Sequence, residues 1–275
     1  MPFEPHLVAS VGMKLSLSGR LWETAKGYRI DLPGHIRTAA ELGFPGIELR
    51  YPLLPKPEDA SGILKLLRQQ GVTPVLAFCA GIPHDTASRA DYERVLAILH
   101  ALNTPFVRIA VTQPIDIPAI QAAASMAEAF HLQVLIHVHI NTACDRVEPA
   151  LSILKAVDRP NVGLLADPLH LVLAGEPDPV AALNRLAPHL RLVNLQAMRH
   201  TRPPEPDGEL HMAGAHWTRC LPGESGGIDF AAVLNDLRRL KYDGWLNIMP
   251  AVGETEDPVA TARAYRTFLA PMLAS

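Results

Sequence analysis

The sequence has few cysteines and no long apolar run. Its three cysteines, Cys79, Cys144 and Cys220, are too few and too scattered for a disulfide framework or a Cys-x-x-Cys zinc site, which fits a reducing cytoplasm. Nowhere do about 18 apolar residues follow one another, and no basic residue precedes an apolar run near Met1. We therefore expect a cytoplasmic protein with neither a membrane span nor an export signal.

Charge is also scarce. Charged residues make up 19% of the chain, the formal net charge is -3, and no long Lys/Arg run offers a basic track to phosphates. This composition argues against a nucleic-acid partner. Hydrophobic residues, in contrast, make up 48% of the 275 residues, and no segment is of low complexity. The chain can bury a large core, and single α/β barrels commonly reach about 250 residues.

One stretch, Val162 to Pro179, suggests where a site lies. Its apolar run from Val162 to Ala166 has the character of a strand buried on both faces, and the run stops at Asp167. His170 follows, so two polar side chains lie together at the carboxyl end of a strand, where parallel α/β proteins build their sites. The alternative is that Asp167 only caps the next helix and His170 lies on that helix's surface.

Strand-like runs alternate with helical patterns along the whole chain, at roughly 30 residues per unit. Strands are expected at Leu7–Met13, Ile47–Arg50, Val72–Ala80, Phe106–Thr112, Gln133–Asn141, Val162–Ala166, Leu190–Met198 and Gly244–Met249. Eight parallel strands with right-handed crossovers predict an α/β fold, a closed (β/α)8 TIM barrel that forms a single domain over residues 1–275.

Two segments are expected to be loops. Lys14 to Gly34 is polar and contains glycine, and it follows the first expected strand. Thr201 to Gly227 is long, polar and rich in Pro and Gly, and a connection of that length inside a compact domain is usually functional. We expect this second segment to be a lid over the site. Its His211 and His216 either face a ligand or lie on the surface.

Alternate side chains of a barrel strand point inward, and the last inward residues form the site. On the strand at Gln133–Asn141 the apolar positions face the helices, which leaves His137, His139 and Asn141 inside. Buried imidazoles need partners for both nitrogens, so we expect a functional role for at least one of the two histidines. The same parity places these further residues inward: Glu48, Arg50, Arg108, Asp167, Asn194, Gln196, Asn247 and Met249.

The charged members of this set allow two interpretations. Glu48 and Arg50 could form only a mutual ion pair at the barrel rim, and Arg108 could neutralise Glu48 or Asp167. A buried arginine also suits an anionic or polyhydroxylated ligand, because its guanidinium donates bidentate hydrogen bonds.

The chain resembles the xylose-isomerase-like barrel superfamily, the group of sugar-phosphate isomerases and epimerases that includes tagatose epimerases, hydroxypyruvate isomerases and inosose dehydratases. The resemblance extends from about Leu7 to Leu273. The motifs that carry it are AAELGFPGIELR (Ala39 to Arg50), VGLLADPLH with AGEPDP downstream (Val162 to Pro179), and PGESGGIDF leading to LKYDGW (Pro222 to Trp245). It implies a TIM barrel that acts on a small carbohydrate or hydroxy acid.

The resemblance also implies a divalent-metal site made by Glu, Asp, His or Gln, and Glu on strands five to eight, with the two glutamates moving protons. The matching positions here hold His137, Asp167, Asn194 and Met249, and His139 and His170 match the family's accompanying histidines. Both catalytic carboxylates are therefore replaced. Methionine can neither ligate a hard cation nor carry a proton.

These departures leave three functional hypotheses. The first is an isomerase- or epimerase-like enzyme with an altered metal site, where Asp167 with His137 or His139 holds zinc, manganese or cobalt and the spare histidine is the general base or acid. We expect the isolated protein to be metal-free or to carry less than one equivalent of a transition metal held by Asp167, His137 and His139. The second is a metal-free lyase or isomerase, or a non-catalytic carbohydrate-binding barrel. The third is a metal-dependent hydrolase built on the pair His137-Val138-His139.

Under the first hypothesis the residues take distinct roles. Catalysis is assigned to His137, His139, Glu48 and Arg108, and substrate contacts to His170, Asn194, Gln196, Arg50 and Asn247. The expected partner is a small-molecule carbohydrate or hydroxy acid. The sequence leaves open whether the chain forms homo-oligomers.

Overall fold

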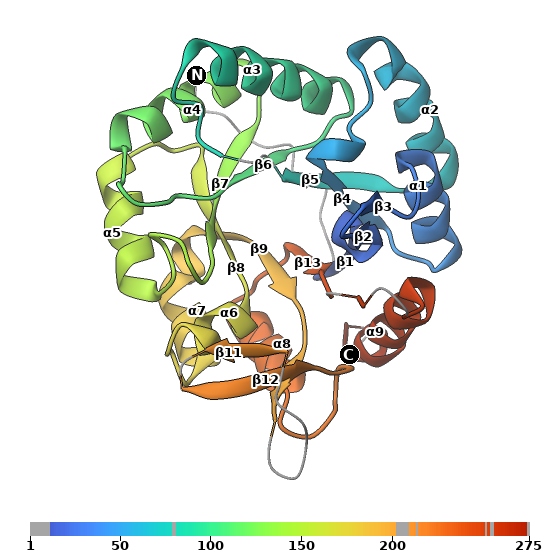
Figure 1. The fold of residues 1–275 in the computed structure, drawn as a ribbon, viewed down its shortest axis with the longest axis vertical. Coiled ribbons are helices and arrows are strands. Elements are labelled where there is room, and N and C mark those ends of the chain that lie inside the picture. Colours follow the sequence, from blue (N-terminus) through green and yellow to red (C-terminus); the bar gives the residue numbers. More distant parts are fainter. Residues whose placement is uncertain are drawn as a thin grey trace.

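A computed structural model describes residues 12–78, 81–201, 209–212, 214–250, 252–253 and 256–273. Eight parallel strands form a closed barrel in the order β1-β13-β9-β8-β7-β6-β5-β4, and β4 pairs with β1 to complete the ring. The strands are β1 (Lys14–Ser18), β4 (Gly46–Arg50), β5 (Thr73–Phe78), β6 (Phe106–Ile109), β7 (Gln133–Val138), β8 (Val162–Ala166), β9 (Leu190–Leu195) and β13 (Trp245–Ile248). Figure 1 shows this ring surrounded by helices. The expected TIM barrel is confirmed.

The helices that surround the barrel mostly begin at aspartates. They are α1 (Leu32–Glu41), α2 (Ala60–Gln70), α3 (Thr86–Ala101), α4 (Ile117–Ala129), α5 (Val147–Val157), α6 (Pro168–Leu173), α7 (Pro179–Leu186), α8 (Phe230–Arg239) and α9 (Pro258–Leu273). The carboxylate of the residue before the helix accepts a backbone N–H of the first turn in α1, α3, α4, α6, α7 and α8. These bonds satisfy donors that lack a partner within the helix. None of the helices in the described ranges is long and apolar enough to cross a membrane.

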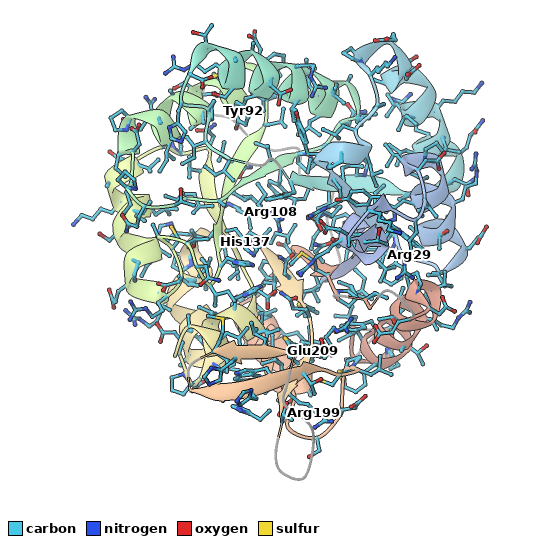
Figure 2. The ribbon with its side chains drawn as sticks, viewed as in Figure 1. Arg29, Tyr92, Arg108, His137, Arg199 and Glu209 are labelled. Atoms are coloured by element: carbon cyan, nitrogen blue, oxygen red, sulfur yellow. The ribbon has the colours of Figure 1, made fainter. Side chains whose placement is uncertain are left out.

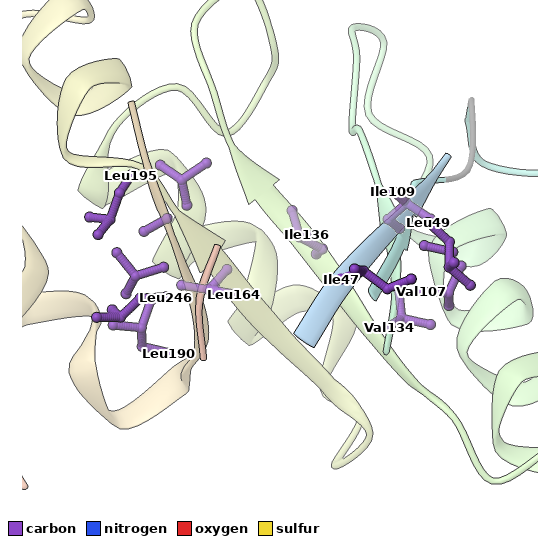
Figure 3. Packing of buried hydrophobic residues seen from close by; sticks show 14 of the residues in the cluster. Ile47, Leu49, Val107, Ile109, Val134, Ile136, Leu164, Leu190, Leu195 and Leu246 are labelled. Atoms are coloured by element: carbon purple, nitrogen blue, oxygen red, sulfur yellow. The ribbon is translucent and has the colours of Figure 1, made fainter. Parts of the chain in front are cut away.

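The main core lies between the outward face of the strands and the helices. Side chains such as Ile47, Val107, Val134 and Leu164 point outward from the strands and are fully buried (Figure 3). Each such side chain stabilises the fold by about 1.5–3 kcal/mol through its burial.

A smaller core fills the barrel itself. It contains Val75, Leu76, Leu135, Leu165 and Leu192, all of which are fully buried. Three neighbouring strands change from leucine to a polar residue along their inward face: Leu135 to His137 from β7, Leu165 to Asp167 from β8, and Leu192 to Asn194 from β9. The barrel interior is therefore apolar at the amino end of the strands and polar at the carboxyl end.

The first barrel strand differs from the prediction. Residues 7–11 of the expected strand Leu7–Met13 lie outside the described residues, and the strand that closes the barrel is β1, inside the segment expected to be a loop. Leu15 and Leu17 belong to the outer core, whereas Ser16 and Ser18 are buried among polar side chains. Serine is not among the β-branched and aromatic residues that are enriched in strands, so the alternation of leucine and serine was not recognised as a strand.

Two further boundaries differ. Strand β7 ends at Val138 rather than at Asn141, which adopts a left-handed backbone with φ of 61°. The segment expected to be a lid loop is partly a sheet, because β11 (Leu210–Met212) and β12 (Ala215–Arg219) pair with each other, and β12 also pairs with β10 (Met198–His200). Figure 1 shows β11 and β12 beside α6 and α7. Residues 202–208 and 213 of that segment lie outside the described part of the chain.

Candidate functional site

The candidate site is the polar layer at the carboxyl end of the barrel strands. The structure brings together the residues expected to point inward except Asn141, which is exposed in a turn beyond the end of β7. Figure 2 shows Arg108 and His137 within the ring of strands. The buried polar members are Glu48, Arg50, Arg108, His137, Asp167, His170, Asn194, Gln196 and Asn247. Apart from His170 of α6, these residues lie inside the barrel, as their inward parity predicted. The contacts of each residue determine its possible chemical role.

Glu48 is enclosed by protein groups. Its Oε2 accepts a short hydrogen bond from Ser18 Oγ and one of 3.0 Å from Asn247 Nδ2, while Oε1 lies 3.6 Å from Arg50 Nη1 and 3.8 Å from Arg108 Nη1. Burial by itself would raise the pKa of Glu48, but Arg108, Arg50 and the two hydrogen bonds together hold it below the ordinary value. Glu48 is therefore an ionised counter-charge, and its geometry favours the ion-pair interpretation over a catalytic one.

Three arginines line the same cavity, and two of them pack on one aromatic ring. The guanidinium carbons of Arg108 and Arg50 lie 4.0 and 4.7 Å from the centre of the Phe78 ring. Arg20, from the 3-10 helix η1 (Gly19–Trp22), completes this arginine cluster of Arg20, Arg50 and Arg108. Burial, reinforced by the charges of Arg50 and Arg20 and opposed by Glu48, lowers the pKa of Arg108 to about 10. The guanidinium groups thus repel one another.

A chain of amide hydrogen bonds crosses the barrel. Ser16 Oγ donates to Asn247 Oδ1 at 3.0 Å, and Asn247 Nδ2 donates to Asn194 Oδ1 at 3.0 Å. Asn194 Nδ2 in turn lies 3.4 Å from His137 Nε2. This geometry makes His137 Nε2 an acceptor, so its proton belongs on Nδ1. Burial, with the nearby charge of Arg108, lowers the pKa of His137 well below the ordinary value.

Asp167, Gln196 and His170 form a second hydrogen-bonded group. Asp167 Oδ1 accepts from the backbone N–H of Leu169 at 2.9 Å, and Oδ2 accepts from Gln196 Nε2 at 2.5 Å. Gln196 Nε2 also lies 2.8 Å from His170 Nε2. Burial raises the pKa of Asp167 to about 7 against the opposing effect of these hydrogen bonds. Asp167 therefore caps α6 and faces the site, and the idea that His170 is a surface residue is wrong because only 6% of it is exposed.

His139 lies just beyond the end of β7. Its Nδ1 is 2.6 Å from the carbonyl oxygen of Ile140, and its ring packs on His170 with 3.7 Å between centroids. Burial lowers the pKa of His139, so the ring is neutral near pH 7. Because Nδ1 must donate to the carbonyl oxygen, Nε2 keeps its lone pair.

Two adjoining cavities meet at this layer. One of about 290 Å³ is lined by the arginine cluster, Phe78 and His137, and one of about 390 Å³ by His170, Gln196 and residues of the small sheet. Arg20 and His139 line both cavities. Their size suits a small-molecule ligand. His211 and His216 line neither of these two cavities, and their rings stack on each other at 4.5 Å.

The donor set does not fit the divalent metal that the fold implies. Within the described ranges, no group of three or more His, Cys, Asp or Glu side chains could hold a metal ion. The four matching positions are already occupied by protein partners: Asn194 faces His137, Gln196 and Leu169 hold Asp167, and Met249 Sδ lies 3.7 Å from Arg108 Nη1. The trio Asp167, His137 and His139 is thus not arranged as ligands, and the cluster of guanidinium groups nearby opposes a cation.

Arg20 is a site residue that sequence reasoning missed. It lies in the segment expected to be a loop, and only the fold brings it to the cavity. Gly19 is the local clue in retrospect, because a Cβ there would lie 2.7 Å from Arg50 Cγ. A glycine permits this close approach of η1 to β4.

The fold is shared with known proteins. A family model described as xylose isomerase-like TIM barrel matches residues 36–269. An inosose dehydratase of Geobacillus kaustophilus is 27% identical over 154 residues, which cover 54% of this chain and 47% of that protein. One of Clostridium tetani is 29% identical over 124 residues, which cover 44% of this chain and 41% of that protein. The chain thus matches less than half the length of these curated relatives.

Solved structures share the whole fold. A probable 3-DHS dehydratase, AsbF, involved in petrobactin synthesis in Bacillus anthracis, has a TM-score of 0.76 at 18% identity and covers 94% of this chain and 99% of that one. A D-psicose 3-epimerase in the presence of D-fructose has a TM-score of 0.75 at 19% identity, with 96% and 100% covered. The IOLI protein with a binding zinc atom has a TM-score of 0.74 at 15% identity, with 95% and 98% covered.

Proposed function

The chain belongs to the xylose isomerase-like TIM barrel family, and on that premise we propose that it is an enzyme that moves a proton next to a carbonyl group of a small carbohydrate or hydroxy acid. The proton-transfer routes of isomerisation, epimerisation and dehydration of such substrates begin with this step. The observation that carries the proposal is His139, whose Nε2 is left as a base and which lines both cavities.

The proposed step is proton abstraction by His139. The Nε2 lone pair takes the proton from the carbon, and the electron pair of the broken C–H bond moves to the carbonyl oxygen to form an enolate. The positive charge of Arg108 stabilises that oxygen as its negative charge develops. In an isomerisation the proton returns to the former carbonyl carbon, while the hydroxyl proton of the deprotonated carbon passes to the enolate oxygen and a new carbonyl forms there. In a dehydration the enolate oxygen reforms its carbonyl and the electron pair expels a hydroxyl group from the next carbon, which leaves as water with a proton from an acidic group.

Asp167 and His170, joined through Gln196, are the second set of proton-handling groups in this proposal. His170 and Gln196 line the cavity of about 390 Å³, and Asp167 is hydrogen-bonded to Gln196. A group of this kind supplies the proton for a leaving hydroxyl, or for the opposite face of the enolate in an epimerisation. Glu48 takes no part in proton transfer, because it stays ionised in its ion pairs.

The proposed steps use side chains of the protein alone. A transition metal held by Asp167, His137 and His139 would require Asp167 to give up Gln196 and His137 to give up Asn194. Elemental analysis after dialysis against a chelator tests this part directly. We expect less than one equivalent of zinc, manganese or cobalt, with activity retained.

Deuterium exchange tests the first chemical step whichever product the reaction finally yields. The protein is incubated in D₂O with a panel of ketoses, ketocyclitols and hydroxy keto acids, and NMR follows deuterium incorporation next to the carbonyl. We expect exchange with at least one member. His139→Gln should slow it by roughly 10²–10⁴-fold, because it removes the general base.

The matched control is His200→Gln, which changes a histidine of the small sheet that stacks on Trp217. It should leave the exchange rate unchanged. The proposal fails if no panel member exchanges, or if His139→Gln exchanges as fast as the unaltered protein. Binding of sugars without any exchange would instead favour the non-catalytic carbohydrate-binding barrel.

A further inference from the structure

We infer that the substrate carries a carboxylate group, which the arginine cluster of Arg20, Arg50 and Arg108 binds. The inference rests on the proposed function and names the substrate class for the same site. Three elements that are far apart in sequence, η1, β4 and β6, each contribute one guanidinium to the cavity of about 290 Å³. Such convergence in a cavity is characteristic of anion recognition.

The charges of the cluster do not cancel within the described part of the protein. Its ion pairs involve two carboxylates, the buried Glu48 and the half-exposed Glu23, whereas the cluster holds three guanidinium groups. Arg20 donates to Gln196 Oε1 at 3.5 Å, and that acceptor is a neutral amide. Asp167 also attracts Arg20 and Arg108, but burial raises the pKa of Asp167 to about 7. When Asp167 is protonated, one positive charge in the described part of the cavity has no counter-charge, and a monoanionic ligand supplies it.

One donor of the cluster also lacks an acceptor among the residues that the structure describes. Arg108 is only 4% exposed, and its Nε is buried with no hydrogen-bond partner there. Its Nη1 faces the weak acceptor Met249 Sδ at 3.7 Å. A buried guanidinium N–H without an acceptor is costly, and a ligand oxygen relieves that cost. The lowered pKa values of Arg108 and Arg20, caused first by burial and reinforced by neighbouring arginines, agree with a site short of negative charge.

The geometry favours a carboxylate over a phosphate dianion. The single uncompensated charge matches a monoanion. The Phe78 ring supports the planar guanidinium groups of Arg50 and Arg108, which fixes their direction in the cavity. A planar carboxylate accepts paired hydrogen bonds from such groups. With the carboxylate at this end, the hydroxylated part of the ligand extends past His139 toward Gln196, so the substrate class is a sugar acid or hydroxy acid.

Calorimetric titration of the whole chain tests this inference with paired probes. Each pair shares a carbon skeleton and differs in the acidic group: D-gluconate with D-glucitol, D-glucuronate with D-glucose, and D-glycerate with glycerol. D-Glucose 6-phosphate is the phosphate probe. We expect at least one acid to bind about tenfold or more tightly than its neutral partner, because only the acid pairs with the guanidinium groups.

Arg20→Gln is the decisive variant, because Arg20 is half-buried and its guanidinium donates to the amide of Gln196. The substitution therefore leaves the ion pairs of the buried Glu48 with Arg50 and Arg108 in place. It should weaken binding of that acid about tenfold and leave the affinity for the neutral partner unchanged. Arg94→Gln, which removes a surface arginine paired with Asp91, is the control and should change neither affinity. Arg108→Gln, checked for folding by circular dichroism, should weaken acid binding at least as much as Arg20→Gln.

Three results overturn the inference: no acid binds better than its neutral partner, D-glucose 6-phosphate binds best, or Arg20→Gln leaves acid binding unchanged. Failure here is distinguishable from failure of the proposed function. Deuterium exchange in a neutral sugar, without tighter binding of acids, would refute the carboxylate-bearing substrate and leave the proposed enzymatic activity standing. Acid binding that depends on Arg20, without exchange in any panel member, would refute the proposed activity and leave the carboxylate site standing.

Discussion

At the scale of single residues, the chain keeps several imidazole rings buried and uncharged. His35 is the clearest case, because it is fully buried and its Nδ1 accepts from Trp22 Nε1 at 2.9 Å, away from the two cavities. Burial lowers the pKa of His35 to about 4. His137 and His170 share this property within the site, whereas the raised pKa of Asp167 has the opposite effect on stability.

His35 should make the fold sensitive to acid. The pKa of His35 in the folded protein lies below the ordinary value of 6.5. As the pH falls, the imidazole of the unfolded chain is therefore protonated before that of the folded protein. The stabilising contribution is complete above about pH 6.5 and is lost as the pH falls toward 4, by at most about 3 kcal/mol. We expect His35→Gln to lose less free energy of unfolding than the unaltered protein over that range.

Urea denaturation at several pH values between 7.5 and 4.5 measures this difference. Other titrating groups, Asp167 included, are present in both proteins and cancel in the comparison. Equal pH dependence of the two proteins would contradict a neutral buried His35. Glutamine can still accept the hydrogen bond from Trp22, so the comparison isolates the titration.

Arg20 shows what a sequence cannot reveal at this scale. The inward parity of His137, Asp167, Asn194 and Gln196 followed from alternation along strands, and the structure brings these residues together. Arg20 lies in a 3-10 turn, and its place in the cavity depends on the approach of Gly19 to Arg50. Contacts between segments that are far apart in sequence leave no periodic pattern.

At the scale of elements, aspartates fix where helices begin. Helix α8 begins after Asp229, whose Oδ1 accepts from the N–H of Ala232 at 2.9 Å. The same residue type starts α1, α3, α4, α6 and α7. Asp before an apolar periodic run is a strong local signal for the start of a helix, and this signal repeats along the chain.

The cap of α8 should contribute measurably to stability. Asp229→Ala removes the acceptor for the Ala232 N–H and should lower the free energy of unfolding by about 0.5–2 kcal/mol. Asp229→Asn, which keeps a side-chain oxygen, should lose much less. The midpoint of thermal unfolding of the three proteins checks this expectation. A cap that contributes nothing would leave alanine and asparagine variants equally stable.

The small sheet of β10, β11 and β12 is the element that sequence reasoning missed. Its strands are short, and the stretch around them is rich in Pro and Gly, which obscures alternation. Leu210 and Arg219 of this sheet line the cavity of about 390 Å³. These two cavity-lining side chains support the proposal that the segment covers the site as a lid.

At the scale of the whole molecule, the barrel followed from regular alternation, because parallel strands joined by helices have few alternative arrangements. The polar layer followed as well, from the change of inward residues near each strand's end. The start of the barrel did not, because β1 alternates leucine with serine rather than with strong strand formers. The metal ligands implied by resemblance also did not hold, because Met249 and the amide network occupy their places.

The leucine core of the barrel has a kinetic consequence. Val75, Leu76, Leu135, Leu165 and Leu192 close the amino end, so the site is a dead end with its openings on the opposite face. Product must then leave by the route that substrate enters, and the two cannot pass each other. We expect product to inhibit competitively in initial-rate measurements, with apparent KM rising and kcat unchanged. Uncompetitive inhibition would mean that product binds while substrate occupies the site, which a cavity with openings on one face and room for one ligand does not allow.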